Sequence, residues 1–189
     1  MRAGLTVDRL VAAGAELADT AGFDAVTTSA LARHFGVKAA SLYSHVASTS
    51  DLRTRIALLA LEEMADRAAL ALAGRAARDA LGALADVYRD YAREHPGRYA
   101  AAQLRLDADA AAASAGPRHA AMTRAVLLGY DLHEPDQTHA VRLLGSVFRG
   151  FVDLEAGGAF SHSEPDSEES WRRTIDALDT LLRSWEATP

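Results

Sequence analysis

The sequence has no cysteine, a single lysine and no long apolar run. Without cysteine the chain can form neither a disulfide framework nor a thiolate zinc site, and it has no cysteine nucleophile. Without a run of about 20 apolar residues it offers no candidate transmembrane helix. The N-terminus also lacks the apolar stretch and cleavage site of a signal peptide. We therefore expect a soluble, cytoplasmic protein that makes no use of a membrane.

Residues that favour strands are scarce as well. β-Branched residues are sparse and alanine is abundant, a composition that favours helices over strands. With 49% hydrophobic residues among 189, the chain can build a core, so global disorder is excluded. Glycine and proline cluster at a few points, and between them the apolar residues recur at helical spacing. The sequence predicts an all-α protein with about nine helices.

The caps and breakers give the expected bounds of these helices. Thr6, Ser48 and either Asp166 or Ser167 are suitable N-caps, whereas Gly22 and Gly36 are suitable helix ends. The expected helices cover residues 6–21, 27–36, 38–45, 49–72, 77–94, 97–106, 118–131, 135–156 and 167–186. Residues 107–117 are alanine-rich and could be helical or frayed, and the sequence leaves both readings open.

Acidic side chains outnumber basic ones, and the excess is unevenly distributed. The net charge is −6, yet residues 1–55 carry six basic and five acidic side chains. The other 134 residues carry 14 basic and 21 acidic side chains. A polyanion would therefore be met only by the N-terminal part of the chain.

Residues 27–46 have the pattern of two short helices that meet at Gly36. We expect Leu31, Val37 and Leu42 to point inward, so that the helix over residues 38–45 stands clear of the domain. One such helix fits the major groove of DNA, which is about 12 Å wide. On spacing alone, a helical hairpin with no nucleic-acid role remains an alternative.

The residues of this segment also carry a family resemblance. Thr27-Thr28, Leu31-Ala32, Phe35-Gly36-Val37, Ser41-Leu42-Tyr43 and His45-Val46 resemble the TetR (tetracycline repressor) family over about residues 6–55. The resemblance implies an N-terminal three-helix helix-turn-helix domain and a helical C-terminal domain for ligand binding and dimerisation. It implies these DNA-binding residues: Thr28, Ser29, Lys38, Ala39, Ala40, Ser41, Tyr43, His45 and Thr49.

Several of these assignments have an ordinary structural alternative. Tyr43 could be a core ring, His45 could satisfy a carbonyl at a helix end, and Lys38 could be a solvated lysine. At Thr49 the sequence departs from the family, because many members have a lysine there that pairs with the DNA backbone. Arg53 or Arg2 would then compensate, together with the amides at the start of the helix over residues 49–72.

The last two expected helices carry broad apolar stripes that exceed what one partner helix covers. With the resemblance, this favours a homodimer held by a four-helix bundle. The expected interface residues are Phe151, Val152, Trp171, Ile175, Leu178, Leu182 and Trp185. The alternative is a monomeric core.

A ligand pocket is expected between the helices of the C-terminal domain. Tyrosine and glutamine among leucine and alanine predict a mostly apolar site with a few polar groups, suited to a largely apolar small molecule. The candidate lining residues are Tyr88, Tyr91, Tyr99, Gln103, Met122, Tyr130 and Phe148. Each of them could equally be an ordinary core residue.

Taken together, these patterns predict two domains and a regulatory function. Residues 1–48 would bind a palindromic operator in double-stranded DNA, and residues 49–189 would bind the ligand and dimerise, with the helix over 49–72 connecting the two. The chain would be a repressor that a small molecule releases; an activator of the same fold is a weaker reading. From another class, a helical carrier or scaffold with a vestigial helix-turn-helix is the alternative.

No pattern in the sequence indicates catalysis. His133 and His139 are six residues apart and do not share a helix face, and there is no His-Glu-x-x-His motif. Gly157-Gly158 follows a helix and is better explained as its C-terminal cap than as a phosphate loop. We expect no catalytic residue, no metal and no cofactor.

Overall fold

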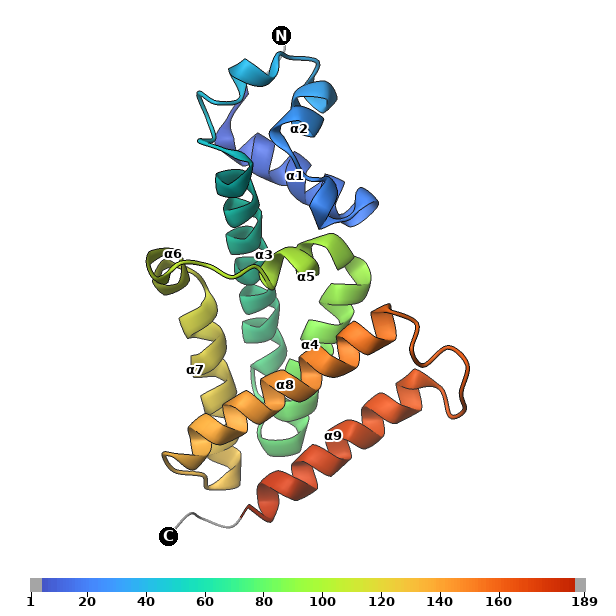
Figure 1. Cartoon of the computed structure of the whole chain (residues 1–189). Coiled ribbons are helices and arrows are strands. Elements are labelled where there is room, and N and C mark those ends of the chain that lie inside the picture. Colours follow the sequence, from blue (N-terminus) through green and yellow to red (C-terminus); the bar gives the residue numbers. More distant parts are fainter. Residues whose placement is uncertain (1–4, 186–189) are drawn as a thin grey trace. The chain divides into compact units, whose positions relative to one another are not determined.

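The computed structural model describes residues 5–185 and contains nine α-helices and no strand in that part (Figure 1). The helices are α1 (Val7–Ala21), α2 (Thr28–Phe35), α3 (Thr49–Leu72), α4 (Ala77–Glu94), α5 (Pro96–Ala102), α6 (Ala108–Ala113), α7 (Gly116–Leu127), α8 (Asp136–Ala156) and α9 (Ser167–Arg183). Short 3₁₀ turns lie at Phe23–Ala25, Ala39–Ser41 and Leu128–Tyr130. The all-α prediction is confirmed.

The helix bounds follow the local capping chemistry. The Thr6 hydroxyl accepts a hydrogen bond from the Arg9 amide at the start of α1 (3.3 Å). At the start of α3 the Ser48 hydroxyl accepts from the Asp51 amide (3.0 Å), while the Asp51 carboxylate accepts from the Ala47 amide (2.8 Å). Such reciprocal capping satisfies amides that a helix leaves without internal partners.

The chain divides into two compact units. We call residues 5–63 with 94–115 the head, and residues 64–93 with 116–185 the body. Helix α3 begins in the head and ends in the body, and the segment 94–115 belongs to the head although both of its sequence neighbours belong to the body. The predicted functional division at residue 48 concerns DNA and ligand binding, and it stays a prediction.

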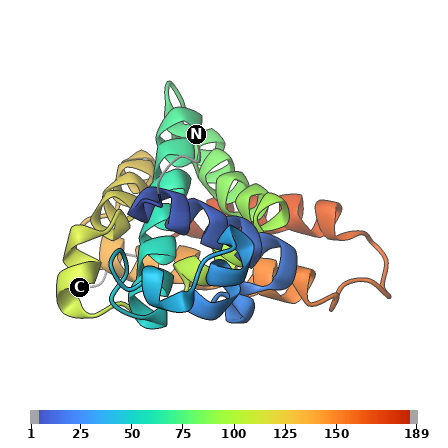
Figure 2. The same ribbon diagram turned by 90° about the horizontal axis from the view of Figure 1, so that it is seen from above.

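The head is built on one apolar core. Leu10, Leu31, Leu42, Leu52 and Ile56 are fully buried in it, and they come from α1, α2, the turn after α2 and α3. Figures 1 and 2 show α2 and the following turn beside α1 in this unit. The segment after α2 is therefore anchored in the core by Leu42, although it does not form an α-helix.

The prediction of an α-helix over residues 38–45 is wrong. The structure has one 3₁₀ turn, Ala39–Ser41, and then a hydrogen-bonded turn. The Ser44 hydroxyl donates to the Ser41 carbonyl (2.9 Å) and occupies an acceptor that helical structure would use. Residues 107–117, which the sequence left open, contain the short helix α6, capped by the Asp107 side chain.

Val37 is also placed differently from the prediction. Gly36 adopts a left-handed conformation (φ 65°), and the Val37 amide donates to the Ala32 carbonyl (3.0 Å). This arrangement closes the end of α2 and leaves Val37 39% exposed instead of inward.

Three of the expected helices have earlier ends than predicted. Helix α5 ends at Ala102 rather than 106, where the amides of Gln103 and Leu104 turn to carbonyls three residues back, and α7 ends at Leu127 rather than 131, where a 3₁₀ turn follows. Helix α9 ends at Arg183, and the predicted end at residue 186 lies outside the described residues. By contrast, the bounds expected for α3, α4 and α8 lie within one residue of those in the structure.

The body is packed around aromatic and aliphatic side chains of α4, α7, α8 and α9. Leu81, Leu84, Leu144, Phe148 and Trp171 are among its most buried members. Helices α8 and α9 run antiparallel, joined by the loop over residues 157–166 (Figure 1). Within residues 5–185, no helix combines the length and apolar character that crossing a bilayer requires.

A buried arginine joins three helices of the body. Arg89 of α4 is 2% exposed, and its Nε and Nη2 donate to the two carboxylate oxygens of Glu155 on α8 (3.0 and 2.7 Å). Its Nη1 donates to Glu168 in the first turn of α9 (2.8 Å). The guanidinium also lies against Phe151 and Trp171, 5.6 and 5.1 Å from their ring centroids. This network compensates a charge that would otherwise be costly to bury.

Glu155 makes the body sensitive to acid. Hydrogen bonds from Arg89 hold the pKa of its carboxyl at about 2, even though burial acts in the opposite direction. Because this folded-state pKa lies below the value in the unfolded chain, the carboxylate stabilises the fold above about pH 5. That contribution, on the order of 3 kcal/mol, is lost as the pH falls toward 2.

We predict that Glu155→Gln lowers the free energy of unfolding at neutral pH by about 3 kcal/mol and flattens its decrease between pH 5 and 2. Denaturant unfolding followed by circular dichroism across this pH range measures both effects. Asp153→Asn is the matched control, because Asp153 forms an exposed ion pair with Arg149 one turn away, and such pairs contribute little. Equal losses in the two variants would contradict the prediction.

Candidate nucleic-acid interface

The segment after α2 presents an exposed face on a buried anchor. Leu42 and Val46 are 0% and 1% exposed, whereas the Tyr43 side chain between them is 56% exposed. Lys38 and Ser41 are exposed as well. We call residues 37–45 the reading segment, because their outward side chains are the ones that could enter a groove.

The other predicted members of this segment are either half-buried or carry only a methyl group. Ala40 is exposed and Ala39 is half-buried, so the first turn offers methyl groups rather than hydrogen-bond donors. His45 is half-buried, and its amide donates to the Leu42 carbonyl (2.9 Å). The reading segment thus brings together one lysine, the hydroxyls of Ser41 and Ser44 and one phenol around a patch of small apolar side chains.

Thr28 and Thr49 form a pair at the start of α2. The Thr49 hydroxyl accepts from the Thr28 amide (3.3 Å), and the two hydroxyls are also within hydrogen-bonding distance (3.3 Å). Thr28 is only 4% exposed, whereas its neighbour Ser29 is exposed. The structure therefore places Thr49 where it fixes α2 on α3, and it leaves Ser29 as the outward hydroxyl of that helix start.

Arg53, considered as a substitute for a lysine at position 49, is engaged inside the head. Its guanidinium donates to the carbonyl oxygens of Val26 (3.1 Å) and Asp24 (2.8 Å) and lies over the Phe23 ring. Arg2, the other candidate, lies outside the described residues. Arg53 thus has a structural role that the sequence did not suggest.

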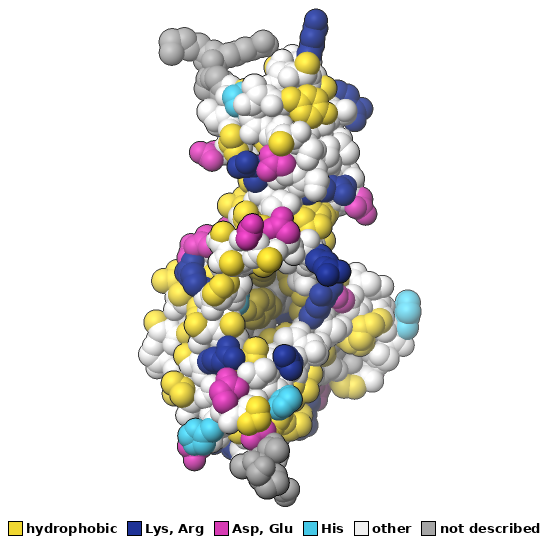
Figure 3. All heavy atoms as spheres, turned by 60° about the vertical axis from the view of Figure 1, so that its left-hand side comes forward, with side chains coloured by type: hydrophobic (Ala, Val, Ile, Leu, Met, Phe, Trp, Pro, Cys, Tyr) yellow, Lys and Arg dark blue, Asp and Glu magenta, His cyan; other side chains and the backbone are white. Residues whose placement is uncertain are grey.

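Exposed positive charge is present near the reading segment. Arg33 near the end of α2 and Lys38 in the reading segment are both exposed. On the face that Figure 3 shows, Lys and Arg side chains stand at the top of the head in this view, and the acidic side chains of the head lie lower. This distribution suits a polyanion better than the net charge of the whole chain does.

The predicted ligand residues are divided between the two units. Tyr88, Met122, Tyr130 and Phe148 belong to or pack against the body core, whereas Tyr99 lies in the head. Gln103 lies in the head as well, and Tyr91 is fully buried in the body with the Arg67 guanidinium over its ring (4.9 Å).

Two of these tyrosines already have strong partners. The Tyr130 hydroxyl donates to Asp179 (2.8 Å), and burial together with this bond raises the pKa of Tyr130 well above its usual value. The Tyr88 hydroxyl lies 2.7 Å from Nδ1 of His119, and the Tyr88 ring lies 6.4 Å from that of Phe148. His119 was not predicted, because a lone histidine in the first turn of a helix gives no signal of its partner.

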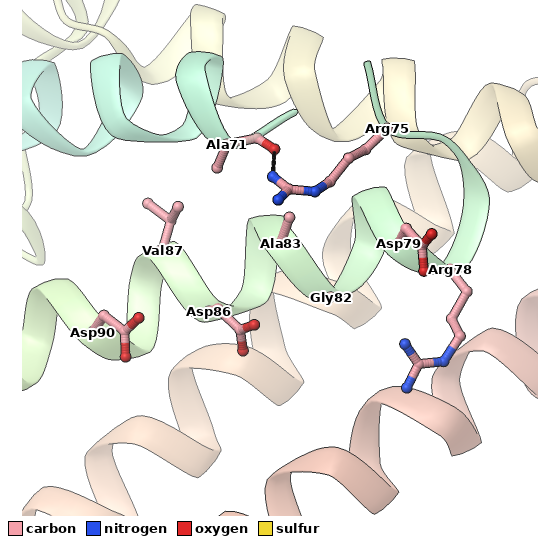
Figure 4. A pocket seen from close by; sticks show the side chains of 9 residues that line it. All are labelled: Ala71, Arg75, Arg78, Asp79, Gly82, Ala83, Asp86, Val87 and Asp90. Carbon is pink, nitrogen blue, oxygen red and sulfur yellow. Dashed lines mark hydrogen bonds between the residues drawn. The ribbon is translucent and has the colours of Figure 1, made fainter. Parts of the chain in front are cut away.

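A groove of about 400 Å³ lies between the last turn of α3 and helix α4 and is lined by different residues (Figure 4). Asp79, Asp86 and Asp90 stand along it over the small residues Gly82 and Ala83. Asp86 accepts a hydrogen bond from the Trp171 indole (2.7 Å). Arg75 and Arg78 line it as well, so the lining is charged with both signs and does not match the apolar ligand that the sequence predicts.

Comparisons with known proteins agree with the geometry of the head. Residues 10–56 match the family described as bacterial regulatory proteins, tetR family, and residues 81–178 match the tetracyclin repressor-like C-terminal domain. The chain is 35% identical to the uncharacterized HTH-type transcriptional regulator Rv0681 of Mycobacterium tuberculosis, over 87% of this chain and 77% of that protein. The chain belongs to the TetR family of transcriptional regulators.

Solved structures show the same fold. A protein of unknown function from Rhodococcus sp. RHA1 superposes with a TM-score of 0.80 at 21% identity, covering 97% of this chain and 98% of that one. BioQ in complex with its double-stranded DNA operator superposes with a TM-score of 0.71 at 19% identity, covering 96% and 99%. Membership of this regulator family favours a DNA-binding function over that of a carrier, a scaffold or an enzyme.

The expected dimer residues of this TetR-family chain are mostly buried within its own body. Val152, Trp171, Ile175, Leu178 and Leu182 are each at most 6% exposed and belong to its core. Phe151 and Trp185 are half-buried and pack against the same core. The stripe that the sequence shows on α8 and α9 is thus the side that faces the chain's own interior.

We predict that Thr49→Val lowers the free energy of unfolding by about 1–2 kcal/mol, because the Thr28 amide loses its acceptor in a partly buried place. Valine keeps the shape and the β-branching of threonine, so packing and helix propensity change little. Chemical denaturation measures the effect. Ser50→Ala, at an exposed neighbouring position, should change stability by less than about 0.5 kcal/mol, and a similar loss there would contradict the assignment.

Proposed function

We propose that this regulator is a homodimeric repressor that binds a palindromic operator through its reading segments and is released by a small, largely apolar effector. The observation that carries the proposal is the reading segment, in which buried Leu42 and Val46 hold Lys38, Ser41 and Tyr43 outward. The family to which the chain belongs supports it, and so does the operator complex of the structurally similar BioQ. The protein would act in the cytoplasm, where the DNA is.

Within the reading segment the roles follow from chemistry. The Tyr43 and Ser29 hydroxyls suit phosphate oxygens, which fix the register on DNA without reading its sequence. Ser41 and the methyl groups of Ala39 and Ala40 suit base edges, including the methyl of thymine. His45 and Lys38 would add contacts to phosphate, while Thr28 and Thr49 would hold the start of α2 in place.

The outer sides of α8 and α9 suit the dimer contact. On α8, the residues Leu143, Val147, Gly150 and Leu154 follow one another at intervals of four, three and four positions, the spacing of a helix–helix seam. Leu154 is 53% exposed and the space around Gly150 is open, whereas Leu143 and Val147 are half-buried against the body core, so this side is only partly covered by its own chain.

Helix α9 carries a second seam of the same kind. Thr174, Ala177 and Leu181 lie beside its buried stripe, and Leu181 is 42% exposed. Two such helices from each copy would form a four-helix bundle, in which small side chains allow close approach. A two-fold dimer of this kind would place its reading segments about 34 Å apart, or a multiple of that distance, on a palindrome.

The effector would bind in the body, where Tyr88 and Phe148 are candidates from its lining. Its binding would favour a conformation in which α3, which begins in the head and ends in the body, no longer holds the two heads at the spacing of the operator. A preference of a few kcal/mol for that conformation is enough for release.

We predict that Lys38→Ala weakens binding to a selected operator and reduces the dependence of log affinity on log salt by about one unit, because one phosphate contact is lost. Tyr43→Phe should weaken binding to all sequences about equally and leave the salt dependence unchanged, because a phenol carries no charge. Selection from random double-stranded DNA followed by titration at several salt concentrations measures both. Arg173→Ala removes an exposed cation on α9; it is the control and should change neither quantity. Unaltered binding in both test variants would contradict the assignment of the reading segment as the DNA interface.

We predict that Gly150→Glu raises the dissociation constant of the dimer at least about 100-fold, because it buries an unpaired charge in the seam. Gly145→Glu is the matched control: it is the same substitution on α8, and both glycines have open space where a side chain would begin. Gly145 lies off the Leu143–Leu154 seam, so this variant should stay dimeric. Sedimentation equilibrium distinguishes the outcomes, and two variants of equal oligomeric state would refute this seam.

A further inference from the structure

The chain carries one side-chain amine and no thiol. Its 20 basic residues are 19 arginines and Lys38, and it has no cysteine. Lysine amines and cysteine thiols are the side chains that activated acyl groups modify most readily, whereas the guanidinium of arginine stays protonated and unreactive. A donor of acyl groups therefore finds a single side chain on this protein with which it readily forms a stable amide.

Lys38 lies at an open point of the reading segment. Gly36 closes α2, and the Lys38 backbone is extended (φ −73°, ψ 141°) before the 3₁₀ turn Ala39–Ser41. Its side chain is exposed and forms no hydrogen bond or ion pair with any residue between 5 and 185. The side chains next to it along the chain, Val37 and Ala39, are small. The amine is therefore accessible to a reagent in solution.

Most other cations nearby are engaged within the head. In residues 5–63, Arg53 donates to backbone carbonyls before α2, Arg55 is paired with a carboxylate one turn away on α3, and Arg9 lies over an aromatic ring of α2. In this part of the described chain, Arg33 and Lys38 are the two cations that no such contact engages. A change at Lys38 therefore removes a large share of the unengaged positive charge beside the reading segment.

Acylation would remove this charge and leave the fold intact, because the buried anchors Leu42 and Val46 do not depend on the Lys38 amine. The resulting amide is neutral and cannot form an ion pair with a phosphate oxygen. Each phosphate contact contributes about 0.9 to the slope of log affinity against log salt, so the loss of one contact weakens binding about eightfold at about 0.1 M salt.

We propose that Lys38 is a site of acylation by an activated acyl donor, either an acyl phosphate or an acyl thioester, and that this modification weakens operator binding. The unprotonated amine attacks the carbonyl carbon of the donor. A nitrogen–carbon bond forms, the bond from that carbon to oxygen or sulfur breaks, phosphate or thiolate leaves, and the proton of the amine passes to solvent. The inference rests on the proposed function, because the loss of affinity requires Lys38 to face DNA, and it adds a covalent means of control that needs no effector.

The test treats the full-length protein with acetyl phosphate or with acetyl-coenzyme A in separate reactions. Peptide mass spectrometry measures the rate of acetylation at Lys38 and separates it from that at the N-terminal amine. We expect at least one donor to acetylate Lys38, and the donor that reacts identifies the source of the acyl group. Operator DNA selected from a random library should slow the reaction about tenfold when about nine-tenths of the protein is bound, because only the free fraction reacts. Acetylated protein should then bind the operator with the reduced affinity and salt dependence of Lys38→Ala.

Two variants serve as controls. Lys38→Arg keeps the positive charge but has no amine, so neither donor should change its DNA binding. The double variant Lys38→Arg with Arg142→Lys moves the single lysine to an exposed position on α8. That lysine should be acetylated at the same rate with and without DNA, and its acetylation should leave operator binding unchanged.

The outcomes separate this inference from the proposed function. The inference is overturned by a Lys38 that neither donor modifies, by a Lys38 that reacts equally fast when DNA is bound, or by acetylated protein that binds the operator with unchanged affinity. Each of these results leaves the proposed function standing. Unmodified protein that binds no double-stranded DNA would reject the proposed function itself.

Discussion

In an element at the surface, the side chains that enter the chain's own core fix which side chains are left facing outward, and this constraint determines which surfaces each part of the molecule can offer to a partner. In the reading segment Leu42 occupies the core of the head, so Tyr43 beside it has to point outward. On α8, Phe148 and Val152 face the body core, so Leu154 on another side is exposed. The surfaces available to DNA and to a second copy are thus consequences of the two cores.

The constraint also explains which parts of the structure could be read from the sequence. The bounds of α3, α4 and α8 were predictable because caps and breakers act within a few residues of each helix end. The existence of an outward-facing segment after Gly36 was predictable because Leu31 and Leu42 fix which side is buried. Its local geometry was not, because the hydrogen bond from the Ser44 hydroxyl to the Ser41 carbonyl competes with helix formation in a way that periodicity does not show.

Contacts across long stretches of sequence were the least accessible. Arg89 lies in the apolar stripe of α4, and a charged residue in such a stripe is a signal that something must pair with it. The partner, Glu155, is 66 residues away, and no local pattern names it. The stripe of α9 was visible in the sequence, but whether Trp171 and Leu178 face their own chain or a partner depends on where α4 and α8 lie.

The docking of α5 on α1 was invisible for a different reason. Gly97 has no side chain, so its contact with α1 produces no apolar residue in the sequence pattern. After Pro96, the sequence indicates only an ordinary helix start at this position. Only the structure shows that the backbone of α1 fills the space that a Cβ would need.

The distribution of charge along the chain limits how DNA can approach. Outside residues 1–55 the chain carries 21 acidic and 14 basic side chains, so the potential of this part repels a duplex. Attraction is confined to exposed cations such as Arg33 and Lys38, close to the reading segment. With few such cations, the nonspecific part of the binding energy is small. In the proposed dimer, recognition would then depend on the fit of two heads to one operator. A change in how the heads are held, without any loss of contacts within either head, would be enough to end it.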